Sequence, residues 1–165
     1  MEDQPVFALL IAGLCENTRS QTLLSLRDTA RAMSQENVEL LRRGFDAFNR
    51  RDLDAYLALM DDDVEFVPRQ GAVEGESSYR RQEGVRRWWN SLFDVFPDYR
   101  IEVVDVRDLG DLTLAAIRLR GHGAGSTAPT DNATSIVVRW RRGKVVWWRT
   151  FDVQAEALEA AGLSE

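Results

Sequence analysis

The hydrophobic period of this sequence changes at Pro97, and that change constrains the fold more than any other feature. Between Met33 and Pro97, most apolar residues recur every three or four positions, which is the period of an amphipathic helix. After Pro97, apolar and polar residues alternate in four successive runs, which is the period of half-buried strands. Helices followed by strands in this way are typical of an α+β fold and not of a parallel α/β fold.

The pattern predicts helices over 34–50, 53–60 and 81–96, with Ser34 and Asp52 as N-caps of the first two. A short strand over 64–68 precedes the third helix, and Pro97 ends that helix. The four runs after Pro97 predict an antiparallel sheet. Its last two strands form a hairpin with a turn over 141–143, and a final helix over 154–161 ends at Gly162.

Residues 1–32 differ from the rest because their helical periodicity is weak, so we expect an N-terminal extension followed by a domain over 33–163. The extension is either an appended leader or an ordered helix that packs on the domain or on a partner. Its apolar run, 6–15, is too short to span a bilayer and follows the acidic residues Glu2 and Asp3. These features favour a cytoplasmic protein with no membrane role.

Composition excludes several function classes. The net charge of −6 argues against nucleic-acid binding, which usually requires a basic face. The single cysteine, Cys15, and the single histidine, His122, exclude an intrachain disulfide and a Cys/His zinc site. We therefore expect no metal and no cofactor, and we expect His122, between two glycines, to be a solvated loop residue.

The order of elements and four local segments resemble the nuclear transport factor 2-like superfamily, specifically its SnoaL-like branch. These segments are ENVELLRRGFDAFNRRDLDAYLALMDDDVEF, EGVRRWW, GDLTLAAIRLRGHGAGS and RRGKVVWWRTFD, and the likeness covers about 33–163. It implies a cystatin-like, cone-shaped roll, in which a curved antiparallel sheet wraps around three helices and encloses one mostly apolar pocket. It also implies a homodimer through the outer face of the sheet. The superfamily holds enzymes and binding proteins, so fold alone does not fix function.

Two enzymatic patterns of the superfamily are not met. Where ketosteroid isomerase-like members carry a base and a protonated acid, this sequence has Pro68 and Ile136. Where limonene-epoxide-hydrolase-like members carry an Asp-Arg-Asp arrangement, only Arg118 remains, at the place of a carboxylate.

The resemblance also implies which side chains face the pocket: Leu114, Ala116 and Arg118, then Thr134, Ile136 and Val138, then Trp148, Thr150 and Asp152. Val145, Trp147 and Phe151 are expected on the outer face, where a partner would cover the tryptophan. A buried arginine needs an anionic partner, and Asp152 is the expected partner of Arg118. This pair is interpreted either as a structural contact or as a clamp for a ligand oxygen. Tyr79 and Trp88 lie near the expected pocket lid, and both are candidate ligand contacts.

We therefore expect a protein that binds a small, mostly hydrophobic molecule. The sequence leaves open whether it also performs cofactor-free acid–base chemistry of the isomerase, cyclase or epoxide hydrolase class, with Asp152 as base and Arg118 as electrostatic stabiliser. The alternative is a non-catalytic ligand-binding or dimerisation module with a residual pocket. An enclosed cavity of about 300 Å³ or more with Arg118 and Asp152 on its wall would favour a ligand site. A cavity packed shut by Trp148 and Trp88 would favour the alternative.

Overall fold

The structure is a computed structural model that describes residues 7–69 and 78–163. Its helices are α1 (Phe7–Arg50), α2 (Leu53–Ala58), α3 (Arg81–Val95) and α4 (Gln154–Ala160). Its strands are β1 (Met60–Val67), β2 (Tyr79–Arg80), β3 (Arg100–Leu109), β4 (Leu112–His122), β5 (Pro129–Arg141) and β6 (Lys144–Phe151). The α+β class expected from the sequence is confirmed.

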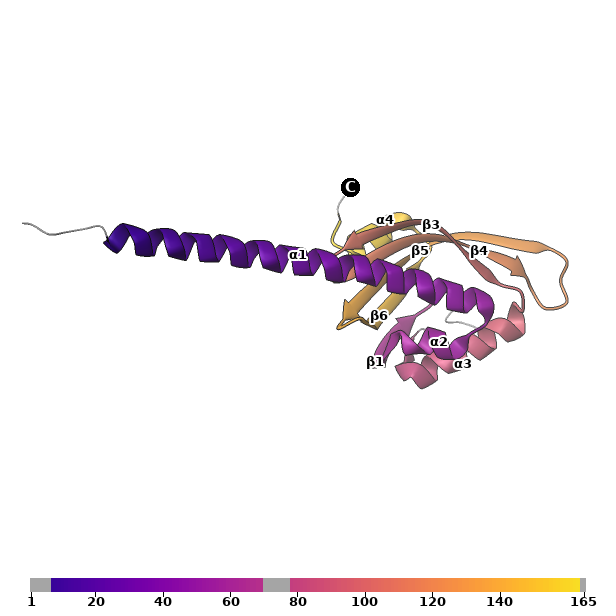
Figure 1. Cartoon of the computed structure of the whole chain (residues 1–165). Helices are drawn as coiled ribbons and strands as arrows, with labels where there is room; N and C mark the ends of the chain where they lie inside the picture. The colour runs from indigo at the N-terminus through magenta and orange to yellow at the C-terminus, as the bar shows by residue number, and fades with distance from the viewer. Residues whose placement is uncertain (1–6, 70–77, 164–165) are drawn as a thin grey trace, which may run out of the picture.

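One curved sheet contains all six strands in the order β2-β1-β6-β5-β4-β3 (Figure 1). Four of the five neighbouring pairs are antiparallel, but β1 and β6 run parallel. The sheet is therefore mixed rather than purely antiparallel. We call the face against which α1 and α3 pack the inner face, and the opposite face, on which α4 lies, the outer face.

Helix α1 is much longer than its sequence pattern predicts. The chain has no proline between Pro5 and Pro68, so nothing stops the helix from extending back from 34–50 to Phe7. Ser34 is consequently not an N-cap, and that prediction is wrong: its hydroxyl donates instead to the carboxylate of Asp108. The N-terminal part of α1 projects beyond the sheet (Figure 1), and the exposed leucines there are Leu23, Leu24 and Leu26. Among the described residues, no helix is long and apolar enough to cross a membrane.

Two local predictions are confirmed by backbone geometry. Asp52 is the N-cap of α2, and its carboxylate accepts a hydrogen bond of 3.0 Å from the backbone N–H of Ala55. At the β5–β6 turn, Arg142 and Gly143 both have positive φ, 52° and 71°. A two-residue hairpin turn of the type that matches strand twist requires this conformation at both positions.

Two hydrophobic clusters cover the two faces of the sheet. The larger lies on the inner face, between the sheet and α1, α2 and α3, and is rich in aromatic rings. The smaller lies on the outer face under α4 and contains Leu114, Val137, Phe151 and Ala157, with Trp147 packed against it. The chain's own C-terminal helix therefore covers part of the outer face.

Candidate functional site

A small cavity lies within the inner cluster, between the sheet and the helices, and has a volume of about 50 Å³. Six aromatic side chains line it: Phe48, Tyr56, Phe66, Trp88, Tyr99 and Trp148. Six further apolar residues complete most of the wall: Pro68, Leu92, Ile101, Ile117, Leu119 and Ile136. Among the described residues, Arg69 adds a charged side chain to the wall and Thr150 adds an aliphatic hydroxyl.

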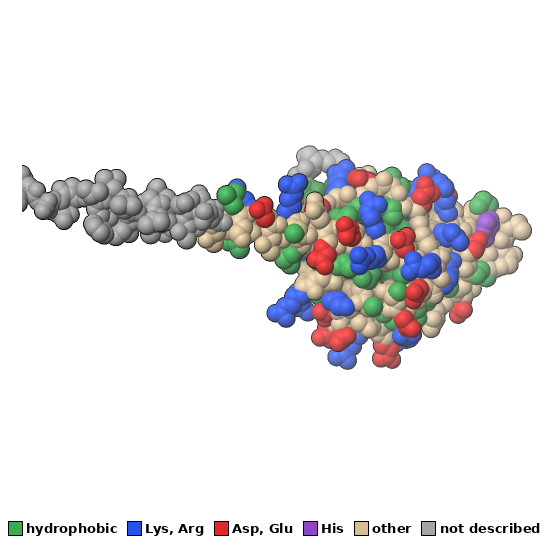
Figure 2. Space-filling model, viewed as in Figure 1, with side chains coloured by type: hydrophobic (Ala, Val, Ile, Leu, Met, Phe, Trp, Pro, Cys, Tyr) green, Lys and Arg blue, Asp and Glu red, His purple; other side chains and the backbone are tan. Residues whose placement is uncertain are grey.

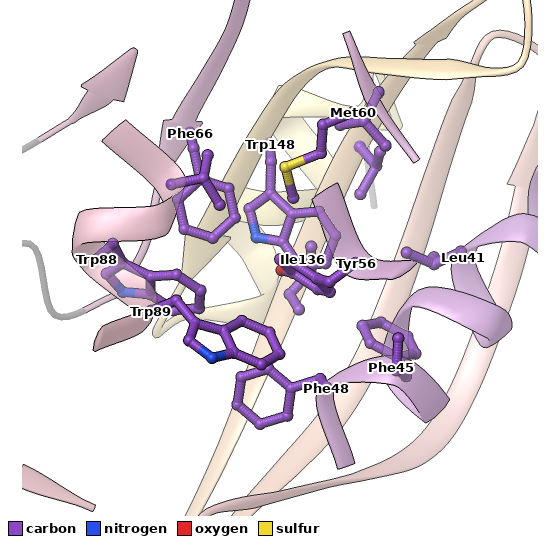
Figure 3. Close-up of a cluster of buried hydrophobic side chains, with 14 of the residues drawn as sticks. Leu41, Phe45, Phe48, Tyr56, Met60, Phe66, Trp88, Trp89, Ile136 and Trp148 are labelled. Carbon is purple, nitrogen blue, oxygen red and sulfur yellow. The ribbon is translucent and has the colours of Figure 1, made fainter. Parts of the chain in front are cut away.

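The rings pack against one another at the edge-to-face and tilted geometries that aromatic pairs prefer. Phe66 contacts both tryptophans of the wall: its ring centroid lies 4.5 Å from that of Trp88 and 5.5 Å from that of Trp148 (Figure 3). Trp148 lies 6.3 Å from Tyr56, which joins the sheet side of the cavity to α2. The cavity is thus a gap between large, flat side chains, contributed by both strands and helices.

The polar groups on the described wall are hydroxyls, the indole N–H groups of Trp88 and Trp148, and one guanidinium. Burial raises the pKa of Tyr56, so its phenol stays protonated at neutral pH and is not available as a base. The Tyr99 hydroxyl accepts a hydrogen bond of 3.2 Å from the side-chain amide of Asn132. The Thr150 hydroxyl accepts one of 3.3 Å from the indole N–H of Trp148. No aspartate, glutamate or histidine is among the described residues that line the cavity.

Arg69 reaches the cavity because β1 and β6 are parallel neighbours. Parallel pairing brings the C-terminal ends of both strands to the same end of the sheet, with Val67 beside Arg149. Arg69 follows the end of β1 and Asp152 follows the end of β6, and their side chains form an ion pair. The Arg69 side chain is 28% exposed, whereas that of Asp152 is 61% exposed. The cation is therefore the more enclosed partner, and the carboxylate lies at the surface.

Four of the candidate site residues predicted from the sequence line the cavity. Ile136, Trp148 and Thr150 come from neighbouring strands of the inner face, and Trp88 comes from α3. Their placement brings together the aromatic part of the predicted site. Thr134 is buried but is not on the cavity wall, and its hydroxyl donates a hydrogen bond of 2.7 Å to the Phe151 carbonyl.

Tyr79 is also placed away from the cavity wall. It lies on β2, opposite Phe66 of β1, and is 1% exposed. Its side chain and backbone lie close beneath Gly84 of α3, where an added methyl group would approach within 3.3 Å of Tyr79. Tyr79 therefore packs β2 against α3.

The predicted orientation of β4 is wrong. Residues opposite each other in an antiparallel pair share a face, and Ile117 lies opposite Thr134 while Ala115 lies opposite Ile136. Alternation then places Leu114, Ala116 and Arg118 on the outer face. The expected set of inward residues is displaced by one position.

The predicted Arg118–Asp152 pair is therefore not formed. The guanidinium of Arg118 donates two hydrogen bonds, of 2.9 and 2.8 Å, to the carboxylate of Asp131 on the adjacent strand. These bonds raise the pKa of Arg118 and lower that of Asp131. Arg118 and Asp152 both border an open hollow of about 340 Å³ on the outer face, but Asp152 pairs with Arg69. Neither residue lies on the wall of the aromatic cavity, and the catalytic roles expected for them stay a prediction.

The last strand, β6, follows the predicted faces except at Val145. Trp147 and Phe151 lie on the outer face, as expected, but they pack under α4, a helix of the same chain. Val145 belongs to the inner cluster. The reason is a β-bulge: Arg139 pairs with Trp147 and Trp140 pairs with Val145, so one extra residue of β6 reverses the alternation there.

His122 is exposed, as expected, but it has a specific partner. Its ring Nδ1 lies 2.7 Å from one carboxylate oxygen of Asp98, and its backbone N–H donates a hydrogen bond of 2.6 Å to the other. These contacts lower the pKa of Asp98. The pair ties the end of β4 to the segment between α3 and β3, and neither residue is on the cavity wall. Among the residues that the structure describes, no group of three or more histidine, cysteine or acidic side chains could hold a metal ion.

Sequence reasoning missed Arg69, Tyr56 and Tyr99 as cavity residues. The helical period of 53–60 already indicated that Tyr56 is buried, but not that it borders a cavity. Arg69 follows a predicted strand and a proline, a position at which a strand end opens into a loop. No local signal shows that this strand end lies beside the end of β6.

The sequence pattern of the SnoaL-like domain family matches residues 41–148, which is more than half of the chain. The chain belongs to the SnoaL-like domain family. The matched region runs from the buried part of α1 to Trp148, so it contains most of the aromatic cavity of this SnoaL-like domain. No curated protein matches the sequence.

Solved structures with the same fold are similar to this SnoaL-like protein at low sequence identity. An NTF2-like protein of unknown function from Burkholderia pseudomallei has a TM-score of 0.66 at 17% identity, covering 75% of this chain and 95% of that one. IdmH of Streptomyces antibioticus, a candidate polyketide cyclase, has a TM-score of 0.62 at 22% identity, covering 77% and 99%. A protein with a ketosteroid isomerase-like fold from Catenulispora acidiphila, in complex with trimethylamine, has a TM-score of 0.63 at 15% identity, covering 76% and 94%. These likenesses establish the fold.

Proposed function

We propose that this protein binds a small, mostly apolar molecule in the aromatic cavity. The observation that carries the proposal is the composition of the wall, which is almost entirely aromatic and aliphatic with a few hydroxyls and one cation. Small-molecule sites typically combine such an apolar surface with a few polar groups that fix orientation. That the Catenulispora protein of the same fold was crystallised with a small molecule supports the proposal.

Binding is supported better than turnover. Acid–base chemistry needs a group that accepts or donates a proton near neutral pH, close to the reacting atoms. The described cavity wall holds tyrosines, a threonine and an arginine, and the pKa of Tyr56 is shifted upward, away from neutrality. The wall therefore suits recognition of a ligand.

The size of the cavity limits how a ligand enters. An apolar cavity of about 150 Å³ is enough for benzene. The cavity here, about 50 Å³, is smaller, and Trp88 and Trp148 fill much of the space. A ligand must therefore displace side chains of the wall. Arg69 and Leu119 are partly exposed, so moving them breaks fewer packing contacts than moving a fully buried residue.

The small volume also favours a second candidate, a non-catalytic module with a residual pocket that associates through the outer face of the sheet. Helix α4 already covers Trp147 and Phe151 there, so a homodimer would use the remaining outer surface near Val104, which is 62% exposed. Sedimentation velocity tests the homodimer directly. A concentration-independent monomer would contradict it.

A thermal-shift screen of small aromatic and alicyclic compounds tests ligand binding. Two variants on β4 form a matched pair: Leu119→Phe narrows the cavity, whereas Leu112→Phe adds the same group on the outer face. Both leucines are partly buried. The proposal predicts compounds that stabilise the wild type and Leu112→Phe but not Leu119→Phe. If no compound stabilises the wild type, or if all three proteins respond equally, the cavity is not the binding site.

A further inference from the structure

The geometry points to a ligand that carries a carboxylate, bound by Arg69 in place of Asp152. This inference rests on the proposed function and adds the chemical class of the ligand: an apolar body that enters the aromatic cavity and an acidic group that stays at its edge. Arg69 is the only charged residue among the described residues that line the cavity.

Arg69 needs an anionic partner at its position on the cavity edge. A guanidinium keeps its charge at any ordinary pH, and with 28% of its side chain exposed it is largely withdrawn from water. Its planar fork of N–H donors matches a carboxylate in two parallel hydrogen bonds. An acid that enters the cavity therefore meets a donor group already positioned at the cavity edge.

Asp152 is a partner that can leave at little cost. Its side chain is 61% exposed, and it follows the last residue of β6, so its carboxylate is free to turn into solvent. Exposed ion pairs contribute little to stability because water competes with both partners. A ligand carboxylate would keep the charge of Arg69 compensated while the apolar body of the ligand gains contacts in the cavity.

Thr150 adds a second polar group beside the proposed anion site. It lies on β6 two residues before Asp152, and it borders the cavity. Its hydroxyl accepts the indole N–H of Trp148, and its own O–H is a donor for a ligand oxygen. An arginine and a hydroxyl at one end of an apolar cavity form the donor set that an amphiphilic acid requires.

Calorimetric titration with 2-naphthoate and 2-naphthamide tests the inference, because the two compounds share shape and differ in charge. We expect the wild type to bind 2-naphthoate about tenfold more tightly than the amide, the difference that a charge-assisted pair provides. Arg69→Gln should bind both compounds equally. Arg118→Gln, which removes an arginine of the outer face, should behave as the wild type.

Asp152→Asn tests the exchange of partners separately. Removing the competing carboxylate should tighten binding of 2-naphthoate several-fold and leave binding of 2-naphthamide unchanged. Equal affinity of the wild type for both compounds, or a preference that survives in Arg69→Gln, would overturn the inference and leave the proposed function standing. If the wild type binds neither compound although the thermal-shift screen finds ligands for the cavity, the inference is overturned and the proposed function stands. If the screen also finds none, both are contradicted.

Discussion

Replacing Trp148 by alanine should destabilise the fold and create a site for a defined molecule. Trp148 is 5% exposed, and its ring packs against those of Phe45, Tyr56 and Phe66. Truncating a buried aromatic residue to alanine costs about 3–5 kcal/mol, since contacts are lost and a void remains. Indole has the shape of the deleted group, and at a hundredfold excess over its Kd it would restore ~2.7 kcal/mol.

Urea denaturation with and without indole measures both effects. Trp147→Ala is the matched control, because Trp147 is the adjacent residue on the outer face and is only partly buried. Trp147 keeps more of its surface in water than Trp148 does, so the control should lose less stability than Trp148→Ala. Indole should stabilise Trp148→Ala alone. Equal losses in the two variants, or equal stabilisation of both by indole, would refute the placement of Trp148 on the cavity wall.

Three further predictions concern the frame around the cavity. Asp52→Ala should lower the free energy of unfolding by about 1 kcal/mol through loss of the α2 cap, and Asp52→Asn should restore it, both measured by urea titration. Gly121→Ala should lower the melting temperature, because its methyl group would lie 2.8 Å from the Asp98 carboxylate and 2.9 Å from a backbone carbon; Gly123→Ala, with no atom closer than 3.8 Å, should not. Hydrogen bonding to His122 holds the pKa of Asp98 below its ordinary value of 3.8. The ionised Asp98 carboxylate therefore stabilises the fold fully above pH 3.8, and this stabilisation is lost as the pH falls through the lowered pKa. Asp98→Asn should therefore be less stable than the wild type at pH 7, and the difference should vanish in acid; a constant difference from pH 7 to pH 2 would contradict this.

The sequence predicted the elements of this fold well because local signals specify them. The Asp52 cap, the turn at Arg142 and Gly143 and the helical stripe of α3 each depend on residues close in the chain. The full length of α1 was not predicted, because a hydrophobic period of three to four residues marks only the part of a helix that packs against the rest of the domain. The side chains described ahead of Ser34, those of residues 22–29 and 31–33, are exposed, and an exposed helix leaves no clear hydrophobic period in the sequence.

The site was predicted only in part because strand register is not a local property. On β4 both faces carry apolar residues, since Leu114 packs under α4 while Ile117 packs inward, and a shift of one residue exchanges the faces. The charges of Arg118 and Arg120, on the same face, were the signal that this face meets solvent. Figure 2 shows basic and acidic side chains interspersed over the visible surface of the domain.

The pairing of Arg69 with Asp152 could not be predicted at all, because it depends on the parallel contact between β1 and β6. The other strands of the sheet lie between β1 and β6 in the sequence, and Arg69 and Asp152 are 83 positions apart. A sequence pattern identifies each strand but not its neighbour. The same pairing is what brings a cation to the cavity edge.

Fluorine NMR of protein labelled with 5-fluorotryptophan tests the central claim most directly, because the five tryptophans report on different places. Trp88 and Trp148 line the cavity, Trp147 lies on the outer face, and Trp140 is bound through its indole N–H to Thr113. Titration with 2-naphthoate should shift the resonances of Trp88 and Trp148 saturably and leave those of Trp140 and Trp147 in place. Shifts confined to Trp147, or no saturable shift at any tryptophan, would contradict a ligand site in the aromatic cavity.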